Sequence, residues 1–174
     1  MKITELFLDE LERETEGSRH VIERVPEGKN DWKPHAKSMP LGYLARLVAD
    51  MPSWIAMAIN QDELDLAPGG KPMPKPPEWH SRRELVELLE KNVAQAREAL
   101  DKTTDEHLTT HWKLLVNGQA VMDEPRYVVI RDSVFNHAAH HRGQLTVYLR
   151  LLNASVPAIY GPSADENSFR ERVA

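Results

Sequence analysis

The chain lacks cysteine altogether, and it is poor in glycine and in aromatic residues. The absence of cysteine excludes disulfides, thiolate metal ligands and a cysteine nucleophile. No apolar run approaches the ~18 residues that a membrane-spanning helix needs, and the acidic start MKITELFLDELERE is unlike a signal peptide. Twenty-two basic residues against 27 acidic ones leave a net charge of −5, which argues against a general nucleic-acid binder. We therefore expect a cytoplasmic protein without nucleic-acid or membrane partners.

What the chain does contain is a globular composition and a helical pattern. Its 174 residues, 41% hydrophobic and 28% charged, suit a single domain over residues 1–174. Apolar residues recur at helical spacing in four long stretches. These stretches predict helices near residues 3–25, 40–58, 82–100 and 125–153. The expected fold class is therefore all-α, a four-helix bundle of up-down helices joined by long connections.

Local signals mark the ends and interruptions of these helices. Ser81 and Glu84 fit a capping box at the start of the third helix. Asp123 and Pro125 predict the cap and the first turn of the fourth helix. Pro52 lies inside the second helical pattern, so it predicts a kink or a tightened turn there.

The remaining segments give weaker signals. The proline-rich stretch 68–77 predicts a connection within one domain. Thr103–Leu108 resembles a short capped turn, and HWKLLVNGQAVM predicts an extended segment with a turn at Gly118. Gly17 and Ser18 predict a bend or an interruption in the first helix, and the final NSFRERVA predicts a last helical turn.

The fourth helix carries an unusual pair of histidines. His137 and His141 lie one turn apart on its core-facing stripe, flanked by His140 and Gln144. Two imidazoles at positions i and i+4 can chelate one metal ion from a single helical face. Ala138 stands where an HExxH metalloprotease has its glutamate, which argues against that class. Buried histidines also serve as hydrogen-bonding groups alone, so the residues leave both roles open.

Three segments resemble one known family. NHAAHHRGQLTVYLRLLNASVPAIYGPSADE is similar to the C-terminal signature of the DinB-like family of damage-inducible, metal-dependent enzymes, and WKPHAKSMPLGYLARLVADMPSW and DEPRYVVIRDSVFNH resemble its earlier segments. The resemblance covers most of residues 30–166. It implies a helical bundle, usually a homodimer, with a divalent metal (Zn, Ni, Mn or Fe) held by three histidines. Two of these histidines would be His137 and His141. The resemblance also implies a thiol transferase or hydrolase that acts on a small molecule and uses a low-molecular-weight thiol as cosubstrate.

The chain departs from the family pattern at the third histidine. That histidine commonly sits in a segment LGxLAxHxAxxPxW, which here reads LGYLARLVADMPSW with Leu47 at the ligand position. Leucine cannot bind a metal. Asp50, three residues further along the same face, or His35 in the preceding loop could complete the site. Alternatively the site has degenerated, and metal binding is weak or absent.

Two functions therefore compete. The first is a DinB-like enzyme whose metal is held by His137 and His141 with an unidentified third ligand. The second is a non-catalytic, metal-free bundle that binds a small molecule or acts as a dimeric, stress-associated interaction protein. The residues do not decide whether the chain is an enzyme, and no catalytic residue is assigned.

Overall fold

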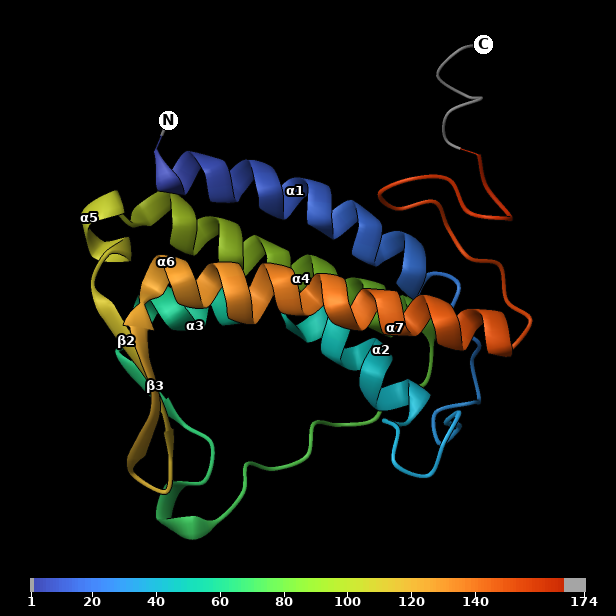
Figure 1. Cartoon of the computed structure of the whole chain (residues 1–174), viewed down its shortest axis with the longest axis horizontal. Helices are drawn as coiled ribbons and strands as arrows, with labels where there is room; N and C mark the ends of the chain where they lie inside the picture. Colours follow the sequence, from blue (N-terminus) through green and yellow to red (C-terminus); the bar gives the residue numbers. More distant parts are fainter. Residues whose placement is uncertain (1, 168–174) are drawn as a thin grey trace.

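The computed structural model describes residues 2–167, so the helical turn predicted for NSFRERVA lies, apart from its first residue, outside the described chain. Long helices lie side by side, with a small sheet at one end (Figure 1). The helical elements and strands in chain order are α1 (Ile3–Ile22), α2 (Leu41–Asp50), α3 (Ser53–Asn60), β1 (Glu63–Asp65), η1 (Pro68–Gly70), α4 (Arg82–Lys102), α5 (Asp105–Leu108), β2 (His111–Val116), β3 (Gln119–Pro125), α6 (Arg126–Val129), η2 (Ile130–Asn136) and α7 (His137–Leu151).

The three-stranded sheet corrects the expected all-α fold class. β1 pairs in parallel with β2, and β2 pairs antiparallel with β3. The hairpin between β2 and β3 turns at Asn117 and Gly118, whose φ angles of 51° and 75° suit a tight turn between twisted strands. The segment predicted to be extended is therefore a strand pair. β1 is only three residues long, and its pairing partner lies about 50 residues away, so no local pattern indicated it.

Asp65 links β1 to the hairpin turn. One carboxylate oxygen accepts the backbone N–H of Asn117 at 2.9 Å, and the other accepts that of Gly118 at 2.7 Å. The backbone N–H of Ala67 also donates to this carboxylate, and these backbone hydrogen bonds hold the pKa of Asp65 below its ordinary value. An ionised side chain at the end of β1 therefore holds the turn of the neighbouring strand pair in place.

The helices do not simply alternate in direction. Arg19 pairs with Glu90 and Arg97 with Glu12, at 2.7 and 3.8 Å, so α1 and α4 are antiparallel. Figure 1 shows α2, α3 and α4 all running opposite to α1 and α7. Because α3 and α4 are parallel neighbours, the chain must return from one end of the molecule to the other between them. Residues 61–81 make this crossover, which explains the length of the proline-rich connection.

Two of the predicted helix signals are confirmed. α2 ends at Asp50 and α3 begins at Ser53, so the helical pattern is interrupted at Pro52 as predicted. The hydroxyl of Ser81 accepts the backbone N–H of Glu84 at 3.3 Å and caps α4.

Two other local predictions are wrong. The fourth helical stretch begins at Arg126, and Asp123 belongs to β3, where its carboxylate lies 2.7 Å from His111. α1 runs without interruption through Gly17. A Cβ at that position would lie 2.9 Å from Cγ2 of Ile159 and 3.4 Å from Cζ of Arg142. The glycine is therefore needed for close packing, and it does not interrupt the helix.

Arg126 fixes the start of the fourth helical stretch against the sheet. Its side chain is buried, 2% exposed. Nη1 donates to the carbonyl of His111 at 2.6 Å, and Nη2 donates to the carboxylate of Asp62 at 2.5 Å. Its backbone N–H donates to the carbonyl of Thr110 at 2.9 Å. These contacts set the position of the residues that follow along the helix.

The apolar core consists of two clusters, one toward the sheet and one toward the opposite end. The first includes Phe7, Ile55 and Ile130, and the second includes Leu44 and Leu145. None of the helices in the described part of the chain combines the length and apolar character that crossing a membrane requires.

Candidate functional site

The helix that carries the histidine pair contains a π-helical segment. Residues Ile130–Asn136 form this segment between α6 and α7, so the chain is helical from Arg126 to Leu151. Hydrogen bonds in a π-helix run from i to i+5, and such segments occur frequently at functional sites. The segment contributes Ser133 and Val134 to the wall of a pocket, and His137 follows it directly.

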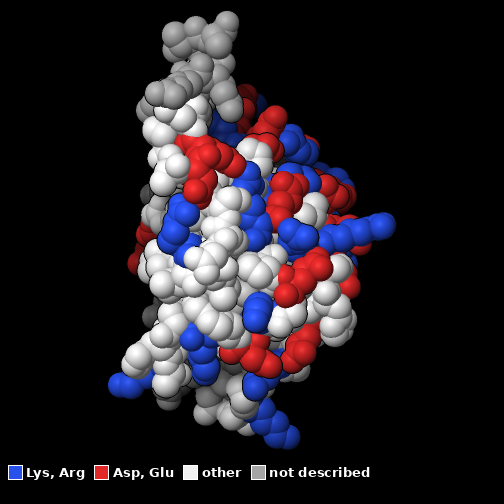
Figure 2. All heavy atoms as spheres, turned by 90° about the vertical axis from the view of Figure 1, so that its right-hand side faces the viewer, with Lys and Arg blue, Asp and Glu red and all other residues white. Residues whose placement is uncertain are grey.

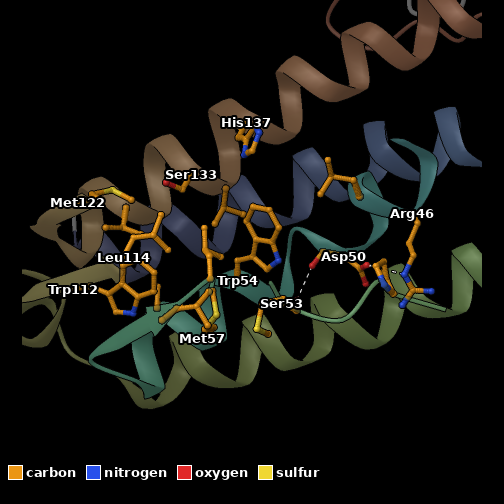
Figure 3. A pocket seen from close by; sticks show the side chains of 18 of the residues that line it. Arg46, Asp50, Ser53, Trp54, Met57, Trp112, Leu114, Met122, Ser133 and His137 are labelled. Carbon is orange, nitrogen blue, oxygen red and sulfur yellow. Dashed lines mark hydrogen bonds and ion pairs between the residues drawn. The ribbon is translucent and has the colours of Figure 1, made fainter. Parts of the chain in front are cut away.

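This pocket has a volume of about 640 Å3 and is mainly apolar. It lies between α2, α3, the π-helical segment, the sheet and the proline-rich loop that contains Met73. Figure 3 shows side chains converging on it from both the helices and the sheet. Its apolar wall includes Leu47, Trp54, Met57, Trp112, Leu114 and Met122.

The sheet supplies one wall through its register. Leu64 of β1 lies beside Leu114 of β2, which in turn lies beside Met122 of β3. All three side chains line the pocket. Sequence reasoning missed this wall, although the alternation of Trp112 and Leu114 before an Asn-Gly turn was a usable strand signal.

The two histidines are in direct contact. Nε2 of His137 lies 2.8 Å from Nε2 of His141, and Nδ1 of His141 lies 2.8 Å from Oε1 of Gln144. His141 is buried, 3% exposed, whereas His137 is half-buried and reaches the pocket. Burial is the largest effect on His141 and holds its pKa below the ordinary histidine value. The indole ring of Trp54 packs against His137 with ring centroids 5.9 Å apart.

The pair has two features of a metal-binding site. Zinc with Zn–N bonds of about 2.0–2.1 Å in tetrahedral geometry places two ligand nitrogens about 3.4 Å apart. The Nε2 atoms of His137 and His141 lie closer than that, at a hydrogen-bond distance of 2.8 Å, so the two rings would have to move slightly apart to hold a zinc ion. A hydrogen bond from the far ring nitrogen, as His141 makes with Gln144, is also the usual support for a metal-bound histidine.

A three-histidine centre nevertheless does not fit the residues present. Leu47 lines the same pocket as His137 and offers it only an apolar surface. Across residues 2–167, no group of three or more His, Cys, Asp or Glu side chains is placed to hold a metal ion. Neither of the two proposed replacements, Asp50 and His35, therefore completes a site of that kind.

Asp50 has other partners. Its carboxylate lies 3.0 Å from Nε of Arg46 and 3.4 Å from Nδ2 of Asn92. Burial outweighs these partners and raises the pKa of Asp50 above its ordinary value. Nη1 of Arg46 also donates to the carbonyl of Pro77 at 3.0 Å, which connects α2 to the proline-rich loop. The Asp50–Arg46 pair forms a polar end of the pocket (Figure 3).

His35 and His140 are also placed by the structure. His35 is exposed in the loop before α2, where its Nδ1 accepts the backbone N–H of Lys37 at 3.1 Å. His140 is exposed, and its ring packs against that of His141 with centroids 5.0 Å apart. Neither lines the pocket.

The YGPSADE tail packs on the end of the helices opposite the sheet. Glu166 pairs with Arg24, which follows the end of α1, and Asp165 pairs with Arg150 of α7 at 2.7 Å. Ser163 holds the tail against the segment that precedes it, because its hydroxyl donates to the carbonyl of Val156 at 2.7 Å. Figure 2 views this end of the molecule, where acidic and basic side chains lie interleaved on the surface. The tail therefore has a structural role.

Arg142 points away from the pocket. Its guanidinium is buried and pairs with the carboxylate of Glu14 and the hydroxyl of Tyr160. The arginine of the HRGQ segment thus joins α7 to α1 and to the tail.

Comparison with known proteins agrees with the fold. A family model described as the DinB family matches residues 4–172. A DinB-like protein from Bacillus cereus ATCC 10987 has the same fold, with a TM-score of 0.64 and 24% identity, and the match covers 88% of this chain and 95% of that one. The DinB-like protein YjoA from Bacillus subtilis also has this fold, with a TM-score of 0.63 and 17% identity, and the match covers 86% of this chain and 94% of YjoA. The uncharacterized protein YrdA of Bacillus subtilis strain 168 is 33% identical over 66 residues, which span 38% of this chain but only 34% of YrdA.

Proposed function

The chain belongs to the DinB family, and from this premise we propose that it binds a largely apolar small molecule in the pocket, with the His137–His141 pair at its wall. The observation that carries the proposal is that Leu47 and His137 line the same pocket. An apolar side chain stands where the family resemblance implies a metal ligand. The ligand would therefore meet a hydrocarbon surface on α2 and an imidazole on α7.

The size and chemistry of the pocket support this proposal. Small-molecule pockets in proteins typically measure about 300–1,000 Å3 and combine apolar walls with a few polar groups. This pocket, at about 640 Å3, has the tryptophans 54 and 112 in its wall. Its polar groups lie at separate places, Ser133 and His137 on one helix and Arg46 and Asp50 on another.

Calorimetric titration with naphthalene-sized test ligands would measure the binding. Ser133→Phe places a ring in the pocket, and we expect it to weaken binding at least tenfold. Val147→Phe is the matched control, because Val147 is 56% exposed on α7 and does not line the pocket. A chain that binds none of these ligands, or that binds them equally well in both folded variants, would contradict the proposal.

A metal-dependent thiol transferase or hydrolase is the second candidate, favoured by the convergence of the Nε2 atoms of His137 and His141 at 2.8 Å. Tag-free protein equilibrated with Zn, Ni, Mn or Fe and then desalted would distinguish the two. We expect Leu47→His to retain metal stoichiometrically and the unmodified chain to retain little. Stoichiometric metal in the unmodified chain, lost in His141→Ala, would favour the enzyme. Assays with a low-molecular-weight thiol cosubstrate would then follow.

The expected homodimer remains a proposal of its own. Sedimentation equilibrium at several protein concentrations would measure the oligomeric state, and a monomer throughout would exclude a dimeric interaction protein.

A further inference from the structure

We propose that the ligand reaches from the apolar pocket into a second cavity, and that the guanidinium of Arg46, where the two cavities meet, donates a hydrogen bond to an uncharged oxygen of the ligand. This inference rests on the proposed small-molecule binding and names the chemical class of the ligand: an elongated carbonyl compound, such as an amide, with a ring-sized apolar end and a polar arm. It follows from the position of Arg46 between the cavities and from the hydrogen bonds that its side chain lacks.

The second cavity adjoins the apolar pocket and has a more polar wall. Its volume is about 390 Å3, and it lies between the start of α2, the loop before it and the proline-rich loop. Three residues line both cavities: Tyr43, Arg46 and Pro76. Charged side chains of both signs line the second cavity alone, namely Asp31, Lys75 and Glu78. A molecule that occupies both cavities therefore needs an apolar end and a polar end.

The guanidinium of Arg46 lies at the boundary between the two cavities. Its Nε is 3.0 Å from the carboxylate of Asp50, which lines the apolar pocket but not the second cavity. Its Nη1 donates to the carbonyl of Pro77 at 3.0 Å, and Pro77 lines the second cavity but not the apolar pocket. Figure 3 shows the head group beside Asp50, at the polar end of the apolar pocket. A molecule that crosses from one cavity to the other must therefore pass this guanidinium.

Most of the hydrogen-bonding capacity of this guanidinium is unused. An arginine head group has five N–H donors in one plane. Within residues 2–167, the bond from Nη1 to Pro77 is the only hydrogen bond that the side chain of Arg46 makes. Nε is buried, and its N–H is not directed at an acceptor, although Asp50 lies beside it. Nη2 has no acceptor in that part of the chain either, but it is not buried, so a bound molecule can contact it.

The neighbouring carboxylate favours an uncharged oxygen on the ligand. Asp50 already places a negative charge 3.0 Å from the guanidinium, which needs acceptors for its N–H groups more than it needs a second anion. A carbonyl oxygen supplies an acceptor without charge, whereas a ligand carboxylate would be repelled by Asp50. A donor left without an acceptor in such a site discriminates against ligands that lack the oxygen.

The proline-rich loop allows an arm to pass over the boundary. Residues 74–78 include three prolines, which have no N–H. The bond from Arg46 to Pro77 is the only hydrogen bond of this stretch to the rest of the described chain. On either side the loop is fixed, because the backbone N–H of Met73 and the indole N–H of Trp79 each donate to a carbonyl, at 3.2 and 2.9 Å. The stretch can therefore shift at the cost of a single hydrogen bond.

Three ligands with one ring system test the inference by calorimetric titration: naphthalene, 4-(2-naphthyl)butan-1-ol and N-(2-hydroxyethyl)-2-naphthamide. The alcohol and the amide have arms of equal length, and only the amide has a carbonyl. We expect the amide to bind on the order of tenfold more tightly than the alcohol. Equal affinity of these two would overturn the inference and, if naphthalene binds, leave the proposed function standing. Failure of all three to bind would overturn both.

A fourth ligand tests the charge of the oxygen. The carboxylate 4-(2-naphthyl)butanoate carries a full negative charge on an arm of similar length. We expect it to bind more weakly than the amide, because Asp50 repels it. Tighter binding of the carboxylate would overturn the assignment of an uncharged oxygen.

Two variants separate the roles of Arg46 and of the second cavity. Arg46→Met removes the donors, and we expect the amide-to-alcohol affinity ratio to fall toward one. Asp31→Trp fills the second cavity with a ring, and we expect the amide to lose its advantage over naphthalene. Lys29→Trp is the matched control, since Lys29 is exposed and lines neither cavity. An unchanged ratio in Arg46→Met, or equal binding of the amide by the two tryptophan variants, would contradict the inference.

Nitrogen-15 NMR of the arginine side chains detects the contact without a measurement of affinity. The Nη resonance of Arg46 is identified by its absence from the spectrum of Arg46→Met. We expect the amide to shift this resonance and the alcohol to shift it much less. Equal shifts with both ligands would overturn the hydrogen bond to the carbonyl.

Discussion

Arg142→Met tests the assignment of a structural role to the arginine of the HRGQ segment. The Arg142 side chain is 1% exposed. Its Nη1 donates to the carbonyl of Glu14 at 2.8 Å and to the hydroxyl of Ser18 at 3.0 Å, and its Nη2 pairs with the carboxylate of Glu14. Nη2 also donates to the hydroxyl of Tyr160, which itself donates to Glu14 at 2.6 Å. Methionine removes the hydrogen bonds of the guanidinium, leaves the one from Tyr160 to Glu14, and keeps much of the apolar stem.

The expected loss of stability follows from the burial of the pair. Removing one partner of a buried ion pair costs about 3–5 kcal/mol, because the other charge is left without compensation. Glu14 is 19% exposed at its side chain and keeps the hydroxyl of Tyr160, so the cost should lie at the lower end. A loss of about 3 kcal/mol lowers the melting temperature of a chain of this size by about 6–12 °C.

Urea unfolding followed by circular dichroism measures this loss. Arg83→Met is the matched control: Arg83 pairs with Glu87 on the surface, with its side chain 86% exposed, and its loss should change stability very little. Glu14→Gln combined with Arg142→Met should cost less than the sum of the two single changes, because the pair is coupled. Equal stability of Arg142→Met and Arg83→Met, or strict additivity of the double variant, would refute the assignment.

Three further predictions concern local contacts. Burial of the hydroxyl and the neighbouring Glu14 raise the pKa of Tyr160 from 10.0 to about 12. The hydroxyl therefore contributes fully to stability below pH 10, and this contribution is lost as the pH rises toward 12. Urea unfolding at stepped pH should show a steeper loss of stability in the unmodified chain than in Tyr160→Phe, and parallel curves would contradict this. Gly17→Ala should destabilise the fold by about 1 kcal/mol, because the new Cβ would lie 2.9 Å from Ile159. In an Ile159→Ala background the same change should instead stabilise the fold, since alanine favours the helix. Destabilisation in both backgrounds would count against the contact. Ser81→Ala should cost about 1 kcal/mol and Ser81→Gly only a few tenths, and equal losses in thermal unfolding would argue against the cap.

Most helices were predictable because their signals are local. The capping box at Ser81 and the interruption at Pro52 depend on residues within one or two turns, and both are confirmed. Gly17 shows where local reasoning failed. Its role depends on Ile159, which lies far along the chain, so a glycine needed for close packing was mistaken for a bend.

The candidate site was predictable in part for the same reason. A separation of four residues on a helix places His137 beside His141, and the apolar stripe of the second helical segment indicated that Leu47 faces inward. The pocket wall formed by Leu64, Leu114 and Met122 was not predictable, because it requires a parallel pairing between strands about 50 residues apart.

Motifs and spacing within single elements were enough to identify the family, to locate the long helices and to find Leu47 where the resemblance implies a metal ligand. The fold class, with its sheet, and the parallel course of α3 and α4 became known from the three-dimensional structure alone. The same holds for the approach of the Nε2 atoms of His137 and His141 and for the contact between His141 and Gln144. The physical reason is that strand pairing, burial and side-chain orientation depend on contacts between distant segments, whereas helical spacing depends on neighbours along the chain.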